Sequence, residues 1–197
     1  MKITDIKTFP IQAGRDMFVI KVETDEGIYG LGEGGCSSRE LAEEAAVQHF
    51  SRFLIGMDPM QIEHIWQKCY RSNYHEGGRV LTGAISAIDI ALWDIAGKKL
   101  GVPVYQLLGG ACRHRVFGFP TVGLNAVDRL EQCHALIDEG WPCLRLHAAT
   151  ELPNWARELH DADPDPNNAF EPRASIAATV EILTELRTKL DRSIPLG

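Results

Sequence analysis

Apolar residues recur at helical spacing between positions 79 and 110, and this is the clearest pattern in the chain. They lie three and four residues apart and form one wide stripe: Leu81, Ala84, Ile85, Ile88, Ala91, Leu92 and Ile95. A stripe of this width predicts a helix that is nearly buried. Gly101 can take the left-handed conformation that ends such a helix, and Pro103 prevents the helix from resuming.

The residues before this helix predict a small antiparallel sheet followed by two shorter helices. Residues 2–11 and the alternating run 18–23 read as strands, and residues 28–33 return after a turn at 24–27. Such a pair is typical of a hairpin. Helices are then predicted over 41–54 and after Asp58 and Pro59, which supply an N-cap and a proline at the first helical position. Strands first and helices afterwards indicate an α+β domain.

The pattern changes after Gly110. It predicts a strand over 115–121, a helix over 128–139 that ends at Gly140, and a strand over 143–148. A loop rich in Asp, Pro and Asn precedes an amphipathic helix over 173–190, and residues 194–196 look like a third strand. Strands that alternate with helices predict parallel β/α units. We therefore expect one domain over residues 1–110 and a second over 111–197.

Composition narrows the classes of protein to consider. The chain has 197 residues, of which 45% are hydrophobic and 24% charged, and its net charge of −7 disfavours nucleic acid or an anionic membrane as partner. No apolar run approaches the roughly 20 residues that span a bilayer, and the N-terminus lacks an apolar signal core. The five cysteines contain no C-x-x-C pair, which favours free thiols in a reducing cytoplasm.

Residues 30–35, GLGEGG, match the G-x-G-x-x-G pattern of a dinucleotide-binding loop. That reading requires the first strand of a parallel βαβ unit and an acidic residue at a second strand about 20 residues later. Here the strand closes an antiparallel hairpin, and the chain 20 residues later is still in a predicted helix. We therefore interpret the glycines as part of a hairpin strand that ends in a loop.

Four segments together resemble the enolase superfamily, and more closely its mandelate racemase and muconate-lactonizing group. They are the opening KITDIKTF, the strand end GLGEG, the helix ALWDIAGK and the connector YQLLGG. Within that group, YRSNYHEGG is most similar to acid-sugar dehydratases, particularly mannonate dehydratases. The resemblance implies an α+β capping domain with a three-stranded antiparallel sheet, followed by the first β/α units of a TIM-type barrel.

The resemblance also implies a reaction. Such enzymes remove the proton α to a carboxylate, stabilise the enediolate on Mg²⁺, and in dehydratases then lose water. Their base often comes from a K-x-K pair on the second barrel strand, and the matching positions here are Arg145 and His147. Strand alternation places both on one face. His147 suits general-base work near neutrality, while Arg145 suits binding a carboxylate or lowering a neighbour's pKa. An ordinary charged pair at a strand end is the alternative.

Loops of the capping domain cover the barrel mouth in this family and shape substrate choice. The matching segments are residues 13–16 and 34–39, which make Arg15 and Arg39 candidates for contact with an acid sugar. Tyr74 and His75 lie in a further loop that can reach an active site or a neighbouring subunit. For each of these side chains the alternative is a solvated surface position.

Two departures from the family pattern limit what the resemblance implies. Mannonate dehydratases have a histidine where this chain has Phe119, and a tyrosine in a loop where this chain has Trp155 and His160. A complete barrel takes about 250 residues, and roughly 80 follow Arg115. The family's three metal carboxylates lie on later strands, so we expect no metal ligand here.

We therefore expect the N-terminal portion of a cytoplasmic, Mg²⁺-dependent sugar-acid dehydratase, inactive by itself and associating as a homo-oligomer. A racemase or cycloisomerase is the nearest enzymatic alternative, because the cap does not fix the fate of the enolate. A non-catalytic oligomeric module is the alternative from another class.

Overall fold

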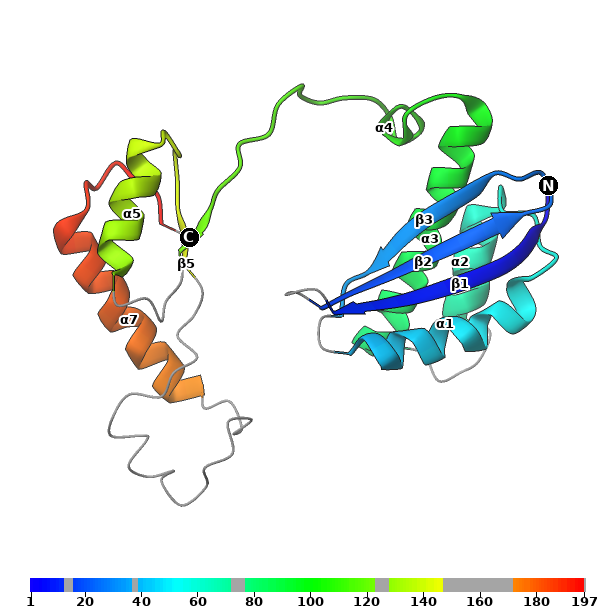
Figure 1. Ribbon diagram of the computed structural model, residues 1–197, viewed down its shortest axis with the longest axis horizontal. Coiled ribbons are helices and arrows are strands. Elements are labelled where there is room, and N and C mark those ends of the chain that lie inside the picture. The colour runs from blue at the N-terminus through cyan, green and yellow to red at the C-terminus, as the bar shows by residue number, and fades with distance from the viewer. Residues whose placement is uncertain (13–15, 37–38, 72–76, 123–127, 147–171, 197) are drawn as a thin grey trace, which may run out of the picture. The chain divides into compact units, whose positions relative to one another are not determined.

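The computed structural model describes residues 1–12, 16–36, 39–71, 77–122, 128–146 and 172–196. The chain divides into two compact units, Met1–Cys112 and Arg113–Gly197, and each is described by itself (Figure 1).

Unit 1 begins with a three-stranded antiparallel sheet of order β1-β2-β3. Its strands are β1 (Ile3–Gln12), β2 (Asp16–Thr24) and β3 (Tyr29–Gly34). The Gly27 N–H donates to the Thr24 carbonyl over 3.1 Å and closes the turn between β2 and β3. Gly27 has a φ of 76°, a left-handed conformation that glycine adopts without strain. The predicted hairpin is confirmed.

Four helices follow in unit 1: α1 (Glu40–Leu54), α2 (Ile62–Arg71), α3 (Arg79–Leu100) and α4 (Val104–Leu107). α1 and α3 cover one face of the sheet (Figure 1), and α2 packs against α3. The predicted stripe of α3 is confirmed, since Ala84, Ile88 and Leu92 are among its fully buried residues. Gly101 follows α3 in the left-handed conformation with φ 68° and ψ 28°, as predicted.

The glycines of β3 allow α3 to lie directly on the sheet. A Cβ atom added to Gly30 would overlap the carbonyl oxygen of Ala91, and one added to Gly32 would overlap that of Ala87. Both glycines are buried, while Leu31 between them is exposed and points away from the helix. The glycine pattern at 30–35 therefore serves the close approach of a strand and a helix backbone.

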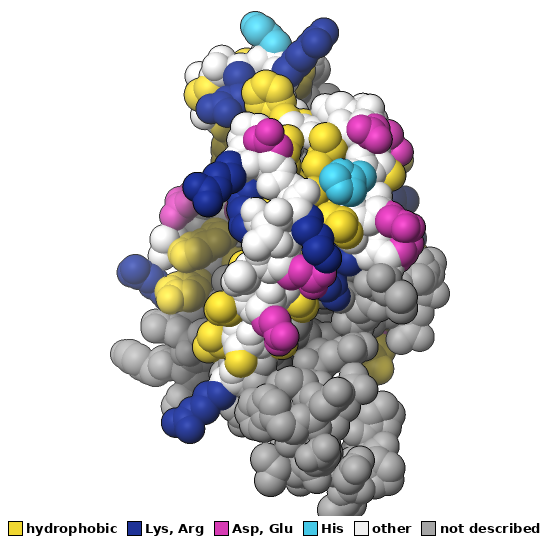
Figure 2. Space-filling model, turned by 90° about the vertical axis from the view of Figure 1, so that its left-hand side faces the viewer, with side chains coloured by type: hydrophobic (Ala, Val, Ile, Leu, Met, Phe, Trp, Pro, Cys, Tyr) yellow, Lys and Arg dark blue, Asp and Glu magenta, His cyan; other side chains and the backbone are white. Residues whose placement is uncertain are grey.

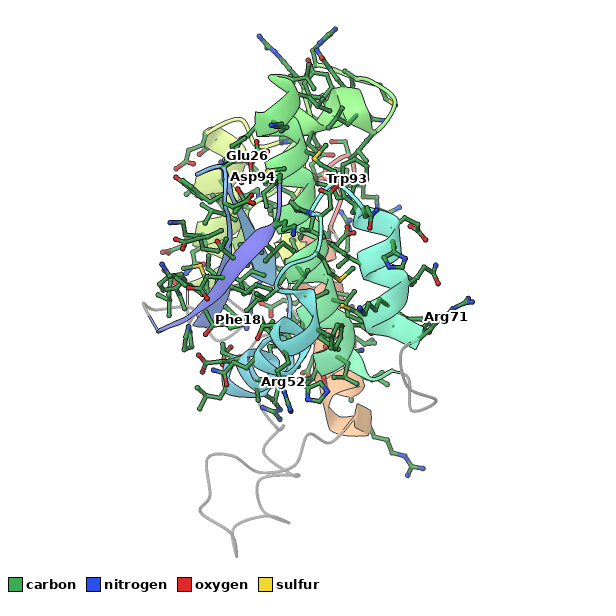
Figure 3. All side chains as sticks on the ribbon, turned by 90° about the vertical axis from the view of Figure 1, so that its right-hand side faces the viewer. Phe18, Glu26, Arg52, Arg71, Trp93 and Asp94 are labelled. Atoms are coloured by element: carbon green, nitrogen blue, oxygen red, sulfur yellow. The ribbon has the colours of Figure 1, made fainter. Side chains whose placement is uncertain are left out.

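The free edge of β3 is protected by α3. The Leu31 N–H donates to Asp94 Oδ2 over 2.9 Å, and Lys98 Nζ donates to the same oxygen over 2.6 Å. Lys98 also donates to the Tyr29 carbonyl over 2.8 Å. Figure 3 shows Asp94 on the sheet side of α3 and Trp93 on the side of α2. This arrangement satisfies edge groups that would otherwise be open to another strand.

By length and composition alone, α3 is also the one described helix that passes the test for a membrane span. Half of its most apolar window is buried inside unit 1, against β3, α1 and α2. The central helix of a packed domain has a similar composition, because much of its surface packs against other apolar elements.

Unit 2 contains β4 (Thr121–Val122), α5 (Arg129–Asp138), β5 (Arg145–Leu146) and α7 (Pro172–Lys189). The two strands are parallel, and a parallel bridge joins Leu144 to Leu196 where the sequence predicts a third strand. The predicted parallel β/α pattern is confirmed.

One predicted boundary in unit 2 is wrong. The first strand was predicted over 115–121, but only its last residue, Thr121, lies in β4. A strand requires a partner, and β5 is only two residues long. Residues 115–119, which precede β4, are exposed, among them Val116 and Phe117.

Candidate functional site

Arg145 lies in β5, where the sequence places a candidate catalytic group. Its N–H donates to the Pro120 carbonyl over 2.9 Å, and in the parallel register it stands opposite Thr121 of β4. Its neighbours Leu144 and Leu146 pack in the same apolar cluster as Leu186 of α7. Because side chains alternate along a strand, Arg145 points to the face of the sheet opposite that cluster.

Thr121 shares that face with Arg145. Its side chain is exposed while Val122, the next residue, is fully buried in the cluster that packs against α5 and α7. A hydroxyl and a guanidinium thus stand side by side on the helix-free face of the described sheet. Thr121 was missed by the sequence analysis, because only the register shows that it lies opposite Arg145.

The predicted site residues divide between described and undescribed parts of the chain. Arg15, Tyr74, His75 and His147 lie outside the described residues, as do Trp155 and His160. Arg39 is described and exposed in unit 1, and Arg145 is described and exposed in unit 2. The structure therefore describes one predicted side chain in each unit.

Arg39 marks the start of α1. Its N–H donates to the Cys36 carbonyl over 3.0 Å, and its own carbonyl accepts the N–H groups of Ala42 and Glu43. Arg39 is the N-cap residue, and its side chain makes no capping hydrogen bond. The helix predicted over 41–54 is confirmed, and it begins at Glu40.

A surface groove of about 750 Å³ lies beside this segment, between the end of β3 and the first turns of α3. Its lining residues are Gly35, Cys36, Gly78, Arg79, Thr82, Gly83 and Ser86. The side chains of Arg79, Thr82 and Ser86 are exposed. The groove thus offers a guanidinium and two hydroxyl groups, which are suited to binding an oxygen-rich anion.

One buried carboxyl group adjoins this groove. Glu43 of α1 is 0% exposed, and its Oε1 accepts the Cys36 N–H over 3.1 Å. Burial raises the pKa of Glu43, the nearby Glu40 carboxylate raises it further, and the hydrogen bond from Cys36 opposes the rise. The sequence analysis missed Glu43, because nothing in the run RELAEEAA separates it from the other glutamates.

The described residues supply no set of metal ligands. Among them there is no group of three or more His, Cys, Asp or Glu side chains that could hold a metal ion. Asp94 pairs with Lys98 and the edge of β3, as described above, and Asp89 accepts a hydrogen bond from Trp93. Burial raises the pKa of Asp89, and Glu63 adds to the rise. The acidic loop at 161–165 lies outside the described residues.

Comparison with known proteins gives one family match. Residues 8–109 match the model of the mandelate racemase / muconate lactonizing enzyme N-terminal domain. The D-galactonate dehydratase of Variovorax paradoxus (strain S110) is 41% identical over 198 aligned residues, which cover 100% of this chain and 47% of that protein. The chain thus spans about half the length of the curated relatives it matches.

Two solved structures share the fold. An enolase from Pantoea ananatis with bound D-gluconate and Mg superposes with a TM-score of 0.77 and 34% identity, over 98% of this chain and 52% of that one. The 3,6-anhydro-D-galactonate cycloisomerase from Zobellia galactanivorans gives a TM-score of 0.68 and 32% identity, over 74% of this chain and 42% of that one.

Proposed function

This chain belongs to the mandelate racemase / muconate lactonizing enzyme family of the enolase superfamily, and from that premise we propose that it contributes to a sugar-acid dehydratase. The observation that carries the proposal is the 41% identity, along the whole chain, to a D-galactonate dehydratase. In the proposed reaction a base removes the proton at C2 of the acid sugar. Hydroxide then leaves C3, takes up a proton as water, and the resulting enol becomes a 2-keto-3-deoxy acid.

Unit 1 is proposed to be the capping domain, near residues 1–110, and unit 2 the beginning of the barrel domain. In this arrangement the helix-free face that carries Thr121 and Arg145 faces the barrel interior. His147 is the proposed base, and Arg145 binds the substrate carboxylate or lowers the pKa of that base. Arg15, Arg39, Tyr74 and His75 are the proposed substrate contacts of the cap.

Mg²⁺ belongs to the proposal for the whole protein and not to the described residues. The Pantoea ananatis neighbour carries Mg together with an acid sugar. The described residues of this chain do not fit such an ion, as shown above.

A panel of acid sugars that includes D-galactonate, D-gluconate and D-mannonate tests the proposed reaction. The whole protein is expected to convert at least one of them into a keto-deoxy acid. His147→Asn is expected to lower kcat at least 100-fold, because a positioned base contributes about 10²–10⁴-fold. Arg145→Met is expected to lower kcat/KM about 10- to 100-fold, and Arg192→Met, at another exposed arginine of unit 2, is the control. Full activity in His147→Asn would contradict the assigned base.

A cycloisomerase or racemase is the second candidate, favoured by the likeness to the Zobellia galactanivorans cycloisomerase. The two reactions differ in the mass of the product, since dehydration removes one water and isomerisation removes none. A product whose mass in ordinary water equals that of the substrate would replace the dehydratase proposal with this one.

We also propose that the protein is a cytoplasmic homo-oligomer, as expected from the sequence. The support is apolar surface on unit 2, where Phe117 is 86% exposed and Phe119 55%. Figure 2 shows further apolar side chains among basic and acidic ones on one face of the molecule. Sedimentation of the purified protein tests this, and a monomer at micromolar concentration would contradict it. A stable oligomer that converts no acid sugar would instead favour the non-catalytic module.

A further inference from the structure

Glu43 occupies an unusual position for a carboxyl group. It lies in the first turns of α1, and its side chain enters between β3 and α3. A Cβ atom added to Gly34 would lie 2.6 Å from its Oε2, and one added to Gly83 would overlap its Oε1. Two glycines on two different elements therefore leave the space that this carboxyl group fills.

The carboxyl group of Glu43 holds the backbone of Cys36. Oε1 accepts the Cys36 N–H, and the Cys36 carbonyl accepts the N–H of Arg39. Both backbone polar groups of Cys36 are therefore hydrogen-bonded to residues at the start of α1. Cys36 in turn lines the groove beside α3. Within the described part of the chain, Oε2 of Glu43 is buried and has no hydrogen-bond partner.

The environment of Glu43 disfavours its charged form. The described residues form no ion pair with it; the charged residues nearest to it along the chain are Arg39, Glu40 and Glu44, and Glu33 of β3 and Arg79 of α3 lie on the neighbouring elements. Of these, Glu40 raises its pKa, in addition to the larger effect of burial. A buried carboxyl group with a raised pKa acts here as a hydrogen-bond acceptor for the Cys36 N–H and not as a counter-charge.

We infer that Glu43 is a positioning residue, which fixes the Cys36 wall of the groove that also contains Arg79, Thr82 and Ser86. This inference rests on the proposed function, in which the segment 34–39 of the cap meets the acid sugar. Glu43 does not touch the substrate. It fixes the position of the backbone that contacts the substrate.

Amide hydrogen exchange of Cys36 in the 197-residue chain tests the anchor without any assay of activity. Glu43→Ala leaves the Cys36 N–H without its acceptor, and we expect its exchange to become about five- to tenfold faster, the loss of one hydrogen bond. Glu43→Gln keeps the acceptor and mimics the neutral acid, so we expect a change of at most about twofold.

Glu44→Ala is the matched control. Glu44 follows Glu43 on the same helix, but its carboxylate accepts the Thr8 hydroxyl of β1 over 2.7 Å. We expect this variant to leave Cys36 exchange unchanged. Equal acceleration in Glu44→Ala would overturn the inference, because the effect would then be a general loosening of α1. Equal acceleration in Glu43→Gln would also overturn it, because the hydrogen bond would then require a charged carboxylate.

Titration gives a second readout. A carboxyl group whose pKa is raised by folding stabilises the folded state at low pH, and that contribution is lost as the pH rises above the ordinary value near 4.5. The free energy of unfolding of unit 1 is therefore expected to fall more steeply above this pH in the wild type than in Glu43→Gln. An identical pH dependence of the unfolding free energy in the two proteins would contradict a raised pKa of Glu43.

Kinetics of the whole protein connect the anchor to the substrate. Glu43→Ala is expected to raise KM for the acid sugar about five- to tenfold and to change kcat less than twofold, with Glu43→Gln restoring the wild-type KM. An unchanged KM alongside accelerated Cys36 exchange would overturn the substrate role. A wild-type protein without activity on any acid sugar would instead contradict the proposed function, while the exchange experiment would still decide the anchor.

Discussion

Unit 1 closes a large apolar core around α3, whereas the described part of unit 2 has a small core and leaves several aromatic side chains in solvent; that core is Val122, Cys133, Leu144, Leu186 and Leu190. The strands of unit 1 run for six to ten residues, and the named strands of unit 2 for two. Apolar burial contributes about 25 cal/mol per Å², so the larger core is expected to give unit 1 the higher stability. The scaffold and the proposed chemistry are therefore expected to lie in regions of unequal stability.

The two units also differ in whether their candidate side chains have hydrogen-bond partners. Asp94 and Glu43 in unit 1 each accept a backbone N–H of the same unit, from Leu31 and Cys36 respectively. Arg145 in unit 2 is exposed and has no hydrogen-bonded or ionic side-chain partner among the described residues. A group that must meet a substrate is expected to stay unpaired until the substrate arrives, whereas a group that holds the scaffold is paired already.

The largest effect is expected from Gly32→Ala. The added methyl group meets the backbone carbonyl of Ala87, which cannot move without displacing α3, so unit 1 should lose at least about 3 kcal/mol of unfolding free energy. Denaturant unfolding followed by hydrogen exchange of each unit measures the loss. Gly35→Ala is the control, because a Cβ there meets nothing within 4 Å. Equal stability of the two variants would show that α3 does not rest on β3.

A smaller effect is expected from Leu186→Ala in the core of unit 2. Leu186 is 2% exposed, and removal of its side chain should cost about 2–3 kcal/mol. Because unit 2 has the smaller core, we expect it to open while the exchange of unit 1 stays unchanged. Ile176→Ala, 64% exposed on the same helix, is the control and should have little effect. Simultaneous opening of unit 1 would show that the two units fold as one.

The smallest of these effects is expected from Asp94→Ala. The change leaves the Leu31 N–H on the edge of β3 without its acceptor and should cost unit 1 about 1–2 kcal/mol. A Tm measurement of unit 1 suffices. Glu185→Ala removes a comparable pair with Lys189 on the exposed side of α7, and we expect no resolvable change there. An equal loss in both variants would mean that edge protection contributes nothing beyond a surface ion pair.

Much of unit 1 was predictable from local pattern. The stripe from Leu81 to Ile95 predicts α3, and Gly101 predicts its end, because helical spacing and a left-handed glycine are properties of the local chain. The strand at 115–121 was placed wrongly for a different reason. A strand exists only where a second strand binds it, and the sequence does not state how long that partner is.

The candidate site divides in the same way. The long buried helix, the order of strands and helices, and the position of Arg145 on a strand were predictable because each depends on residue types at fixed spacing, and the family was predictable because four segments resemble its members. The contacts of the folded chain were needed to show that Thr121 stands opposite Arg145 and that Glu43 lies between Gly34 and Gly83. Both depend on which distant segments come into contact. A buried glutamate and an exposed one have the same side chain, and only the atoms packed around them tell the two apart.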